Sequence, residues 1–298
     1  MNDRQIGLIQ RAAAKLKQAD APGVVPPVQV NFGPMSYATK DNPATTSKPA
    51  KNRNVSAPEL IVDRGKLAKA GISFSADERS RLAEEFRVIK RQVLSIAQRP
   101  DAVDAAGKSK RLILVTSARP LEGKTFVAAN LALAIASERD SRVLALDCDP
   151  ARQTFSEAFG VGRRSGFGDL LAGDLDSVSE ILIHTNIPNF NIIPFGQRHA
   201  DTTELFSSKR MKGLMEEMGR RYPDRYIVID APPCLATSEA STLAPLVGQI
   251  MFVVEANRTQ QTEIEEALRL VSACPNISLV LNKTDWDSPE QFGSHGYY

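Results

Sequence analysis

The chain from residue 111 to residue 284 alternates between short apolar runs and longer amphipathic segments. Nearly continuous apolar runs of this size are typical of strands buried on both faces of a parallel sheet. The segments between them have helical spacing. The runs predict strands at residues 112–115, 143–146, 191–193, 226–229, 250–254 and 277–281. The fold class that follows is α/β, a mostly parallel sheet flanked by helices.

Helical periodicity is clearest at residues 124–137, 209–220 and 262–273, and a further helix is predicted upstream, over residues 75–97. The upstream segment begins with Ser75-Ala-Asp-Glu, which has the form of a capping start. Its apolar positions recur at the spacing of one helix face, at Leu82, Phe86, Ile89, Val93 and Ile96.

Residues 20–58 differ in composition, because prolines recur there among Ala, Ser, Thr, Asn and Lys. Such a segment buries too little apolar surface to offset the entropy of ordering, so we expect a disordered linker. We therefore divide the chain into three parts. Residues 1–74 hold a short N-terminal helix and the linker, residues 75–284 form the domain, and residues 285–298 are a flexible tail.

Composition narrows the class of protein without identifying it. The chain has 298 residues, 42% of them hydrophobic, and a net charge of +2, which gives no argument for binding nucleic acid. The N-terminus lacks the apolar region of a signal peptide, and no apolar stretch approaches the ~20 residues of a membrane span. We expect a cytoplasmic protein that reaches a membrane only through a partner.

The scattered cysteines predict buried core residues in a reducing compartment, at Cys148, Cys234 and Cys274.

A phosphate-binding loop is predicted between the first apolar run and the helix that follows it. Residues 112–125 read LILVTSARPLEGKT, so that Gly123, Lys124 and Thr125 open the helix. Backbone N–H groups at such a turn bind phosphates, the lysine adds a point charge, and the threonine hydroxyl suits Mg²⁺. The first glycine of the usual GxxxxGK[ST] motif is here Ala118. The competing interpretation of the motif is a loop lysine on an unrelated fold. The predicted nucleotide-binding residues are Ala118, Arg119, Pro120, Leu121, Glu122, Gly123, Lys124, Thr125 and Phe126.

Aspartates follow two of the predicted strands. Asp147 and Asp149 end one strand, and Asp230 ends another. Ligands of open α/β sheets bind beyond the carboxyl ends of the strands, so these carboxylates are expected to meet the phosphate loop. Asp230 would hold Mg²⁺ together with Thr125, and Asp147 would help to position the metal. Either Asp147 or Asp149 would accept a proton from an attacking hydroxyl. Each aspartate alone could also be a simple strand-end cap.

In this order the motifs resemble the bacterial protein-tyrosine kinases of capsule and exopolysaccharide biosynthesis, including the autokinases found beside exosortase systems. That family belongs to the deviant P-loop ATPases. The resemblance covers about residues 83–284 and rests on the Pro-x-Glu-Gly-Lys-Thr loop, on Asp147-Cys-Asp149 and on Asp230-Ala-Pro-Pro. The chain also ends in two tyrosines, as a tail of phosphoacceptors would. The resemblance implies Mg²⁺ and ATP as cofactors and protein tyrosine as substrate.

Further expectations follow from the same resemblance. Tyr297 and Tyr298 would be phosphorylated by a neighbouring subunit. The helix at residues 75–98 would form the interface of a ring-like homo-oligomer, although the family's last arginine is here Lys90, or Arg91 one residue later. A separate transmembrane activator, a polysaccharide copolymerase, would hold the protein at the inner membrane, and phosphorylation would regulate polysaccharide polymerisation and export. The expected interface residues are Glu84, Arg87, Lys90 and Arg91.

Two alternatives remain open. A partition or positioning ATPase shares the sheet and all three motifs without kinase activity, but usually carries a signature lysine near the start of the loop. Arg119 occupies that position here. A scaffold that binds ATP without turnover is the other alternative, and the intact Lys124, Thr125, Asp147 and Asp230 argue against it.

Overall fold

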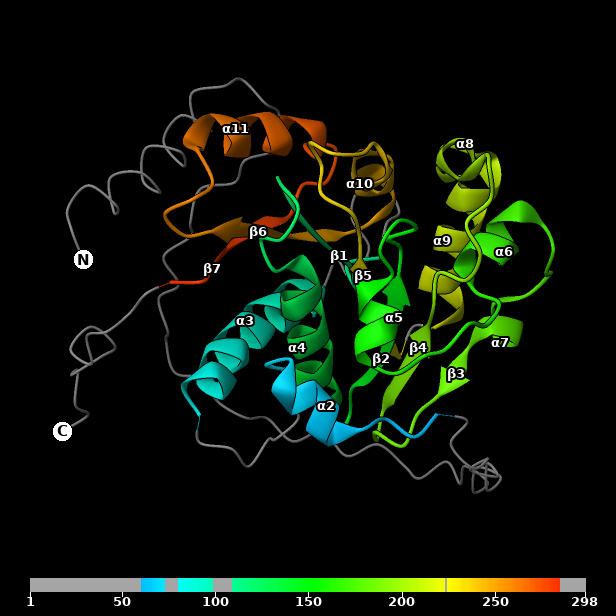
Figure 1. Cartoon of the computed structure of the whole chain (residues 1–298), viewed down its shortest axis with the longest axis horizontal. Coiled ribbons are helices and arrows are strands. Elements are labelled where there is room, and N and C mark those ends of the chain that lie inside the picture. Colours follow the sequence, from blue (N-terminus) through cyan, green and yellow to red (C-terminus); the bar gives the residue numbers. More distant parts are fainter. Residues whose placement is uncertain (1–59, 73–79, 99–108, 223, 285–298) are drawn as a thin grey trace, which may run out of the picture.

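The computed structural model describes residues 60–72, 80–98, 109–222 and 224–284 of the chain (Figure 1). Several expectations fall outside these residues: the short N-terminal helix, the linker at residues 20–58, and the tail with Tyr297 and Tyr298. Within the described residues, no helix is both long and apolar enough to cross a membrane.

A seven-stranded sheet forms the centre of the molecule, in the order β3-β4-β2-β5-β1-β6-β7. Every pair is parallel except β3 and β4, so the predicted α/β class is confirmed. All six predicted strands are present, and β3 is an additional strand of only two residues. The strands are β1 Leu112–Ser117, β2 Arg142–Asp147, β3 Ile183–His184, β4 Phe190–Ile193, β5 Arg225–Asp230, β6 Gln249–Glu255 and β7 Ile277–Asn282.

Helices cover both faces of the sheet, with α3 and α4 on one side and α10 and α11 on the other (Figure 1). Successive strand residues point to opposite faces. Leu114 therefore packs in one core cluster with α6, α9, α10 and α11, while Val115 packs in the other with α2, α3, α4 and α5. The helices are α2 Arg64–Lys69, α3 Arg81–Ala97, α4 Lys124–Ala136, α5 Thr154–Ala158, α6 Phe167–Ala172, α7 Val178–Ile181, α8 Thr202–Phe206, α9 Lys209–Arg221, α10 Glu239–Leu243, the 3-10 helix η1 Ala244–Leu246 and α11 Gln261–Leu270.

The start of α3 corrects one prediction. The helix begins at Arg81, and Ser80 is its N-cap, with extended backbone and a side chain that accepts a 3.2 Å hydrogen bond from the Ala83 N–H. The predicted start at Ser75 is therefore wrong. Serine can cap a helix at either position, and the apolar stripe begins only at Leu82, which is where packing against α4 makes the helix stable.

Residues 60–72 pack against the domain, although the sequence division placed them before it. The α2 helix within this segment begins after Asp63, whose side chain accepts from the N–H groups of Gly65 and Lys66. Leu67 is fully buried in the core cluster on the α4 side of the sheet. A short apolar anchor of this kind lacks the repeated periodicity that identifies longer helices.

Strand register brings the three sequence motifs together. Asp230 of β5 is paired with Asp147 of β2 on one side and with Val115 of β1 on the other. The loop after β1 leads directly into α4, which begins at Lys124. The phosphate-loop sequence and both aspartate motifs therefore lie at the carboxyl edge of three adjacent strands.

Candidate nucleotide site

The loop between β1 and α4 has a backbone shape that explains its glycine. Gly123 has φ 95°, in the left-handed region, and a Cβ atom at this position would overlap the Asn282 amide. Leu121 also has a positive φ of 70°, which is uncommon for a residue with a side chain. The loop ends at the N-terminus of α4, where the first backbone N–H groups of a helix lack partners within it and favour anions.

Lys124 is almost completely buried and faces a carboxylate. Its Nζ lies 3.1 Å from Asp149 Oδ2. The other oxygen of Asp149 accepts from the N–H groups of Ala151 and Arg152, at 3.2 and 3.1 Å. These bonds fix the aspartate to the turn after β2, so that the turn and the phosphate loop are joined through one ion pair.

Thr125 connects the start of α4 to β5. Its hydroxyl donates to Asp230 Oδ2 at 2.7 Å and lies 3.1 Å from the Thr154 hydroxyl. The second oxygen of Asp230, Oδ1, is buried and has no hydrogen-bond partner among the described residues. The Thr125 hydroxyl and a carboxylate oxygen of Asp230 that accepts no hydrogen bond from the described residues therefore lie together beside the phosphate loop.

Asp147 is held by a residue that the sequence analysis missed. Its Oδ2 accepts from both the N–H and the hydroxyl of Ser156, at 3.0 and 2.7 Å. Its Oδ1 accepts from the Asp149 N–H at 3.1 Å. Ser156 lies on α5, nine residues after Asp147. No motif marks that serine, so only the fold reveals the contact.

Burial dominates the electrostatics of the site. It raises the pKa of Asp147 to about 6, although the hydrogen bonds from Ser156 act in the opposite direction. It also raises the pKa of Asp230 to about 7, and the charge of Lys124 and the Thr125 hydrogen bond only partly oppose this. Burial likewise raises the pKa of the Cys148 thiol well above its usual range, with help from the surrounding aspartates. Carboxyl groups whose pKa is raised by burial favour a bound cation, because its positive charge would stabilise their ionised forms.

These residues fit a hard divalent cation. Such cations take oxygen ligands, and the Thr125 hydroxyl and Asp230 present oxygens side by side. The buried Oδ1 of Asp230 supplies a ligand atom that no protein donor uses within the described residues.

The remaining residues of the predicted loop have other surroundings. Ala118 is fully buried just after the end of β1, which explains why a small residue stands there. Arg119 is exposed, and its guanidinium lies 3.3 Å from Glu263 of α11. Pro120 is exposed on the surface. The Phe126 ring packs edge-to-face with Phe86 of α3, with ring centres 5.9 Å apart.

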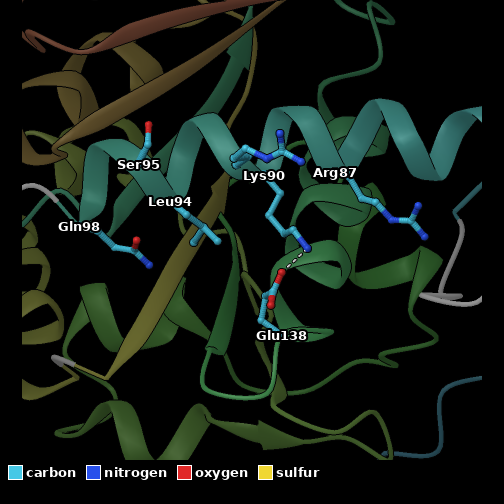
Figure 2. A pocket seen from close by; sticks show the side chains of 7 residues that line it. Arg87, Lys90, Leu94, Ser95, Gln98 and Glu138 are labelled. Atoms are coloured by element: carbon cyan, nitrogen blue, oxygen red, sulfur yellow. Dashed lines mark hydrogen bonds and ion pairs between the residues drawn. The ribbon is translucent and has the colours of Figure 1, made fainter. Parts of the chain in front are cut away.

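The predicted interface residues lie apart from this site, on α3. Arg87 pairs with Glu84 on the same helix, and Lys90 reaches Glu138 at 2.5 Å (Figure 2). Glu138 follows the C-terminal end of α4, whereas Lys124 begins that helix; at 1.5 Å per residue the two ends are separated by about 20 Å. A surface pocket of about 480 Å³ lies here, lined by Arg87, Lys90, Arg91, Leu94, Ser95, Gln98 and Glu138.

Comparisons with known proteins agree with the motifs. A family model described as an AAA domain matches residues 111–273, more than half of the chain. The tyrosine-protein kinase Wzc of Salmonella typhimurium is 30% identical over 235 residues, which are 73% of this chain and 32% of the relative. The tyrosine-protein kinase Etk of Escherichia coli is 28% identical over 258 residues, which are 78% of this chain and 35% of the relative. The chain thus spans about a third of the length of these curated relatives.

Solved structures give the same result. The kinase domain of Escherichia coli tyrosine kinase ETK aligns with a TM-score of 0.58 and 25% identity, covering 78% of this chain and 98% of that domain. The VpsO kinase domain aligns with a TM-score of 0.53 and 28% identity, covering 69% of this chain and all of that domain. The resemblance to bacterial tyrosine kinases, predicted from the motifs, is confirmed.

Proposed function

The chain belongs to the AAA domain family, and from this premise we propose that it is an ATP-dependent protein-tyrosine autokinase that regulates exopolysaccharide or capsule polymerisation and export. One observation carries the proposal: Lys124 and Thr125 of the phosphate loop each contact an aspartate from a different strand end. The tyrosine kinases among its relatives favour this function over that of a positioning ATPase.

The phosphate loop would bind the triphosphate of ATP. Backbone N–H groups of the loop and the Lys124 ammonium would hold the β- and γ-phosphates, which would draw Lys124 away from Asp149. Thr125 and Asp230 would hold Mg²⁺, and Asp147, which is paired with Asp230 on the neighbouring strand, would help to position the ion. When bound, Mg²⁺ would neutralise charge on the phosphate oxygens.

Phosphoryl transfer then requires an in-line hydroxyl and a proton acceptor. The tyrosine oxygen forms a bond to the γ-phosphorus, the bond from that phosphorus to the bridging oxygen breaks, and ADP leaves. The hydroxyl proton passes to Asp147 or Asp149. Their contacts differ, because Ser156 donates twice to one oxygen of Asp147, whereas Asp149 Oδ2 faces only the Lys124 ammonium among the described residues.

The assembly and the acceptors are part of the same proposal. Tyr297 and Tyr298 would enter the site of a neighbouring subunit, with Glu84, Arg87 and the adjoining basic residues of α3 forming the interface of a ring. Phosphate on the tail would add about −1.5 to −2 charges per tyrosine and repel neighbouring tails. We propose a separate transmembrane copolymerase as the membrane partner, with other protein tyrosines as further substrates.

A mixing experiment tests the proposal. A Lys124→Met chain with an intact tail is combined with a size-tagged Tyr297→Phe/Tyr298→Phe chain that has an intact site, and Mg²⁺-ATP is added. Phosphotyrosine on the Lys124→Met chain supports kinase activity between subunits. ATP hydrolysis without phosphotyrosine in the wild-type chain would instead favour the positioning ATPase.

A further inference from the structure

Two residues at the end of β7 contact the backbone of the phosphate loop. The Asn282 side-chain amide donates to the Glu122 carbonyl at 2.8 Å. The Lys283 ammonium donates to the Leu121 carbonyl at 2.7 Å and also lies 3.3 Å from Glu255 at the end of β6. These two consecutive carbonyls therefore point towards β7.

Glu122 is held a second time through its side chain. This carboxylate is 1% exposed, and one oxygen accepts from the Arg119 N–H at 2.7 Å. The other oxygen accepts from the Thr259 hydroxyl, which lies 137 residues away, between β6 and α11. The sequence suggested that Glu122 binds the nucleotide. Its side chain instead connects two parts of the phosphate loop, through Arg119, and fixes the loop to the segment between β6 and α11, through Thr259.

The direction of these carbonyls fixes the direction of the neighbouring N–H groups. In a trans peptide the C=O and the following N–H point in opposite directions. With the Leu121 and Glu122 carbonyls turned towards β7, the N–H groups of Glu122 and Gly123 point away from it. Neither N–H donates a hydrogen bond within the described part of the chain. Paired, unused backbone N–H groups before a helix N-terminus form a concave site for anions.

We propose that Asn282 and Lys283 are positioning residues that aim the N–H groups of Glu122 and Gly123 at the phosphates of the nucleotide. The inference rests on the proposed function and adds to it the residues that shape the phosphate site. It assigns Asn282 and Lys283 to the loop carbonyls and not to the nucleotide base. The positive φ of Leu121 shows why support is needed, because a residue with a side chain holds that conformation only when its surroundings fix it.

The structure also provides a matched control. Asn276 lies just before β7, at its opposite end, and its side-chain amide donates to the Gly248 carbonyl at 2.9 Å. It is the same residue type making the same kind of bond, beside the same strand but away from the loop. An Asn276→Ala variant therefore reports the general cost of losing one such bond.

The test uses the full chain and calorimetric binding of two ligands, Mg²⁺-ATP and Mg²⁺-tripolyphosphate, which has no base. We expect Asn282→Ala and Lys283→Ala each to weaken both ligands about fivefold to tenfold, the effect of one hydrogen bond of about 1 kcal/mol. Lys283→Arg should retain most of the affinity because it keeps a cationic donor, and Asn276→Ala should bind as the wild type does. Thermal unfolding by circular dichroism confirms that each variant is folded.

Three outcomes contradict the inference. Unchanged affinity in folded Asn282→Ala and Lys283→Ala chains would show that the loop does not depend on them. A loss confined to ATP would instead make them base-binding residues. A wild-type chain that binds neither ligand would overturn the proposed function, and with it this inference. If the wild type binds both ligands, the proposed function is retained whatever the affinities of the variants.

Discussion

The hydroxyl of Thr125 donates a 2.7 Å hydrogen bond to Asp230, a residue 105 positions further along the chain. This bond joins the first turn of α4 to the end of β5 and places two oxygen ligands beside the phosphate loop. Because one Asp230 oxygen is buried without a hydrogen-bond partner among the described residues, the pair has more ligand capacity than the protein itself uses.

Asp230→Asn should reduce autophosphorylation by about 100-fold or more, because a metal ligand contributes several kcal/mol of charge stabilisation. The neutral amide keeps the size of the side chain but is a poor ligand for Mg²⁺. The rate of phosphotyrosine formation, measured across a Mg²⁺ titration, should also need higher Mg²⁺ to reach half its maximum. A variant with the wild-type rate and the wild-type Mg²⁺ requirement would exclude Asp230 from the metal site.

Ser156→Ala should reduce the rate of transfer about tenfold. Both the hydroxyl and the N–H of Ser156 donate to Asp147, and the N–H remains in the variant. The loss of rate should therefore fall at the lower end of the 10- to 100-fold range that is typical of residues that orient metal ligands. Steady-state kinetics provides the measurement. Ser137→Ala is the control, since among the described residues that hydroxyl donates only to a carbonyl at the end of α4, away from the site. Equal rates in the two variants would show that Ser156 has no role in orienting Asp147.

Much of this organisation is predictable from sequence, and the exceptions have physical causes. The six main strands were found because burial on both faces makes them continuous apolar runs, and the loop and aspartates were found because their chemistry needs particular residues in a fixed order. β3 was missed because two residues cannot show a pattern. Ser156 and Thr259 were missed because each contacts its carboxylate through the fold and lies in no motif.

Charge reversal on α3 should weaken self-association. Arg91 is exposed and has no ion pair within the described part of the chain, whereas Lys90 is paired with Glu138, so Arg91 is better placed to bind a neighbouring subunit. We expect Arg91→Glu to raise the dissociation constant of the oligomer by at least about tenfold, because like charges across an interface repel each other. Sedimentation velocity measures this shift.

Arg220→Glu is the matched control for that experiment, because it reverses an exposed arginine on α9 that, like Arg91, has no ion pair within the described residues. If both variants dissociate equally, net charge explains the effect. If Arg91→Glu keeps the wild-type oligomer, this face of α3 is not the interface.

The cysteines should be protected from alkylation in the folded chain. All three are free and buried, and burial raises the pKa of Cys234 from 9.0 to about 11. Between these two pH values the thiolate forms mainly in the unfolded chain, so stability should fall as pH rises through this window. Iodoacetamide labelling at pH 9, followed by mass spectrometry, should modify Cys234 only when urea is added. Rapid labelling without urea would contradict its burial.

Mass spectrometry of the purified full chain after incubation with Mg²⁺-ATP shows directly whether the protein phosphorylates its own tyrosines. A Lys124→Met chain serves as the control, because it lacks the cation that pairs with Asp149 and would bind the phosphates. We expect phosphate on Tyr297 or Tyr298 in the wild type and none in the variant. A folded, oligomeric wild type that hydrolyses ATP without gaining phosphotyrosine, or equal phosphorylation in both chains, would contradict it.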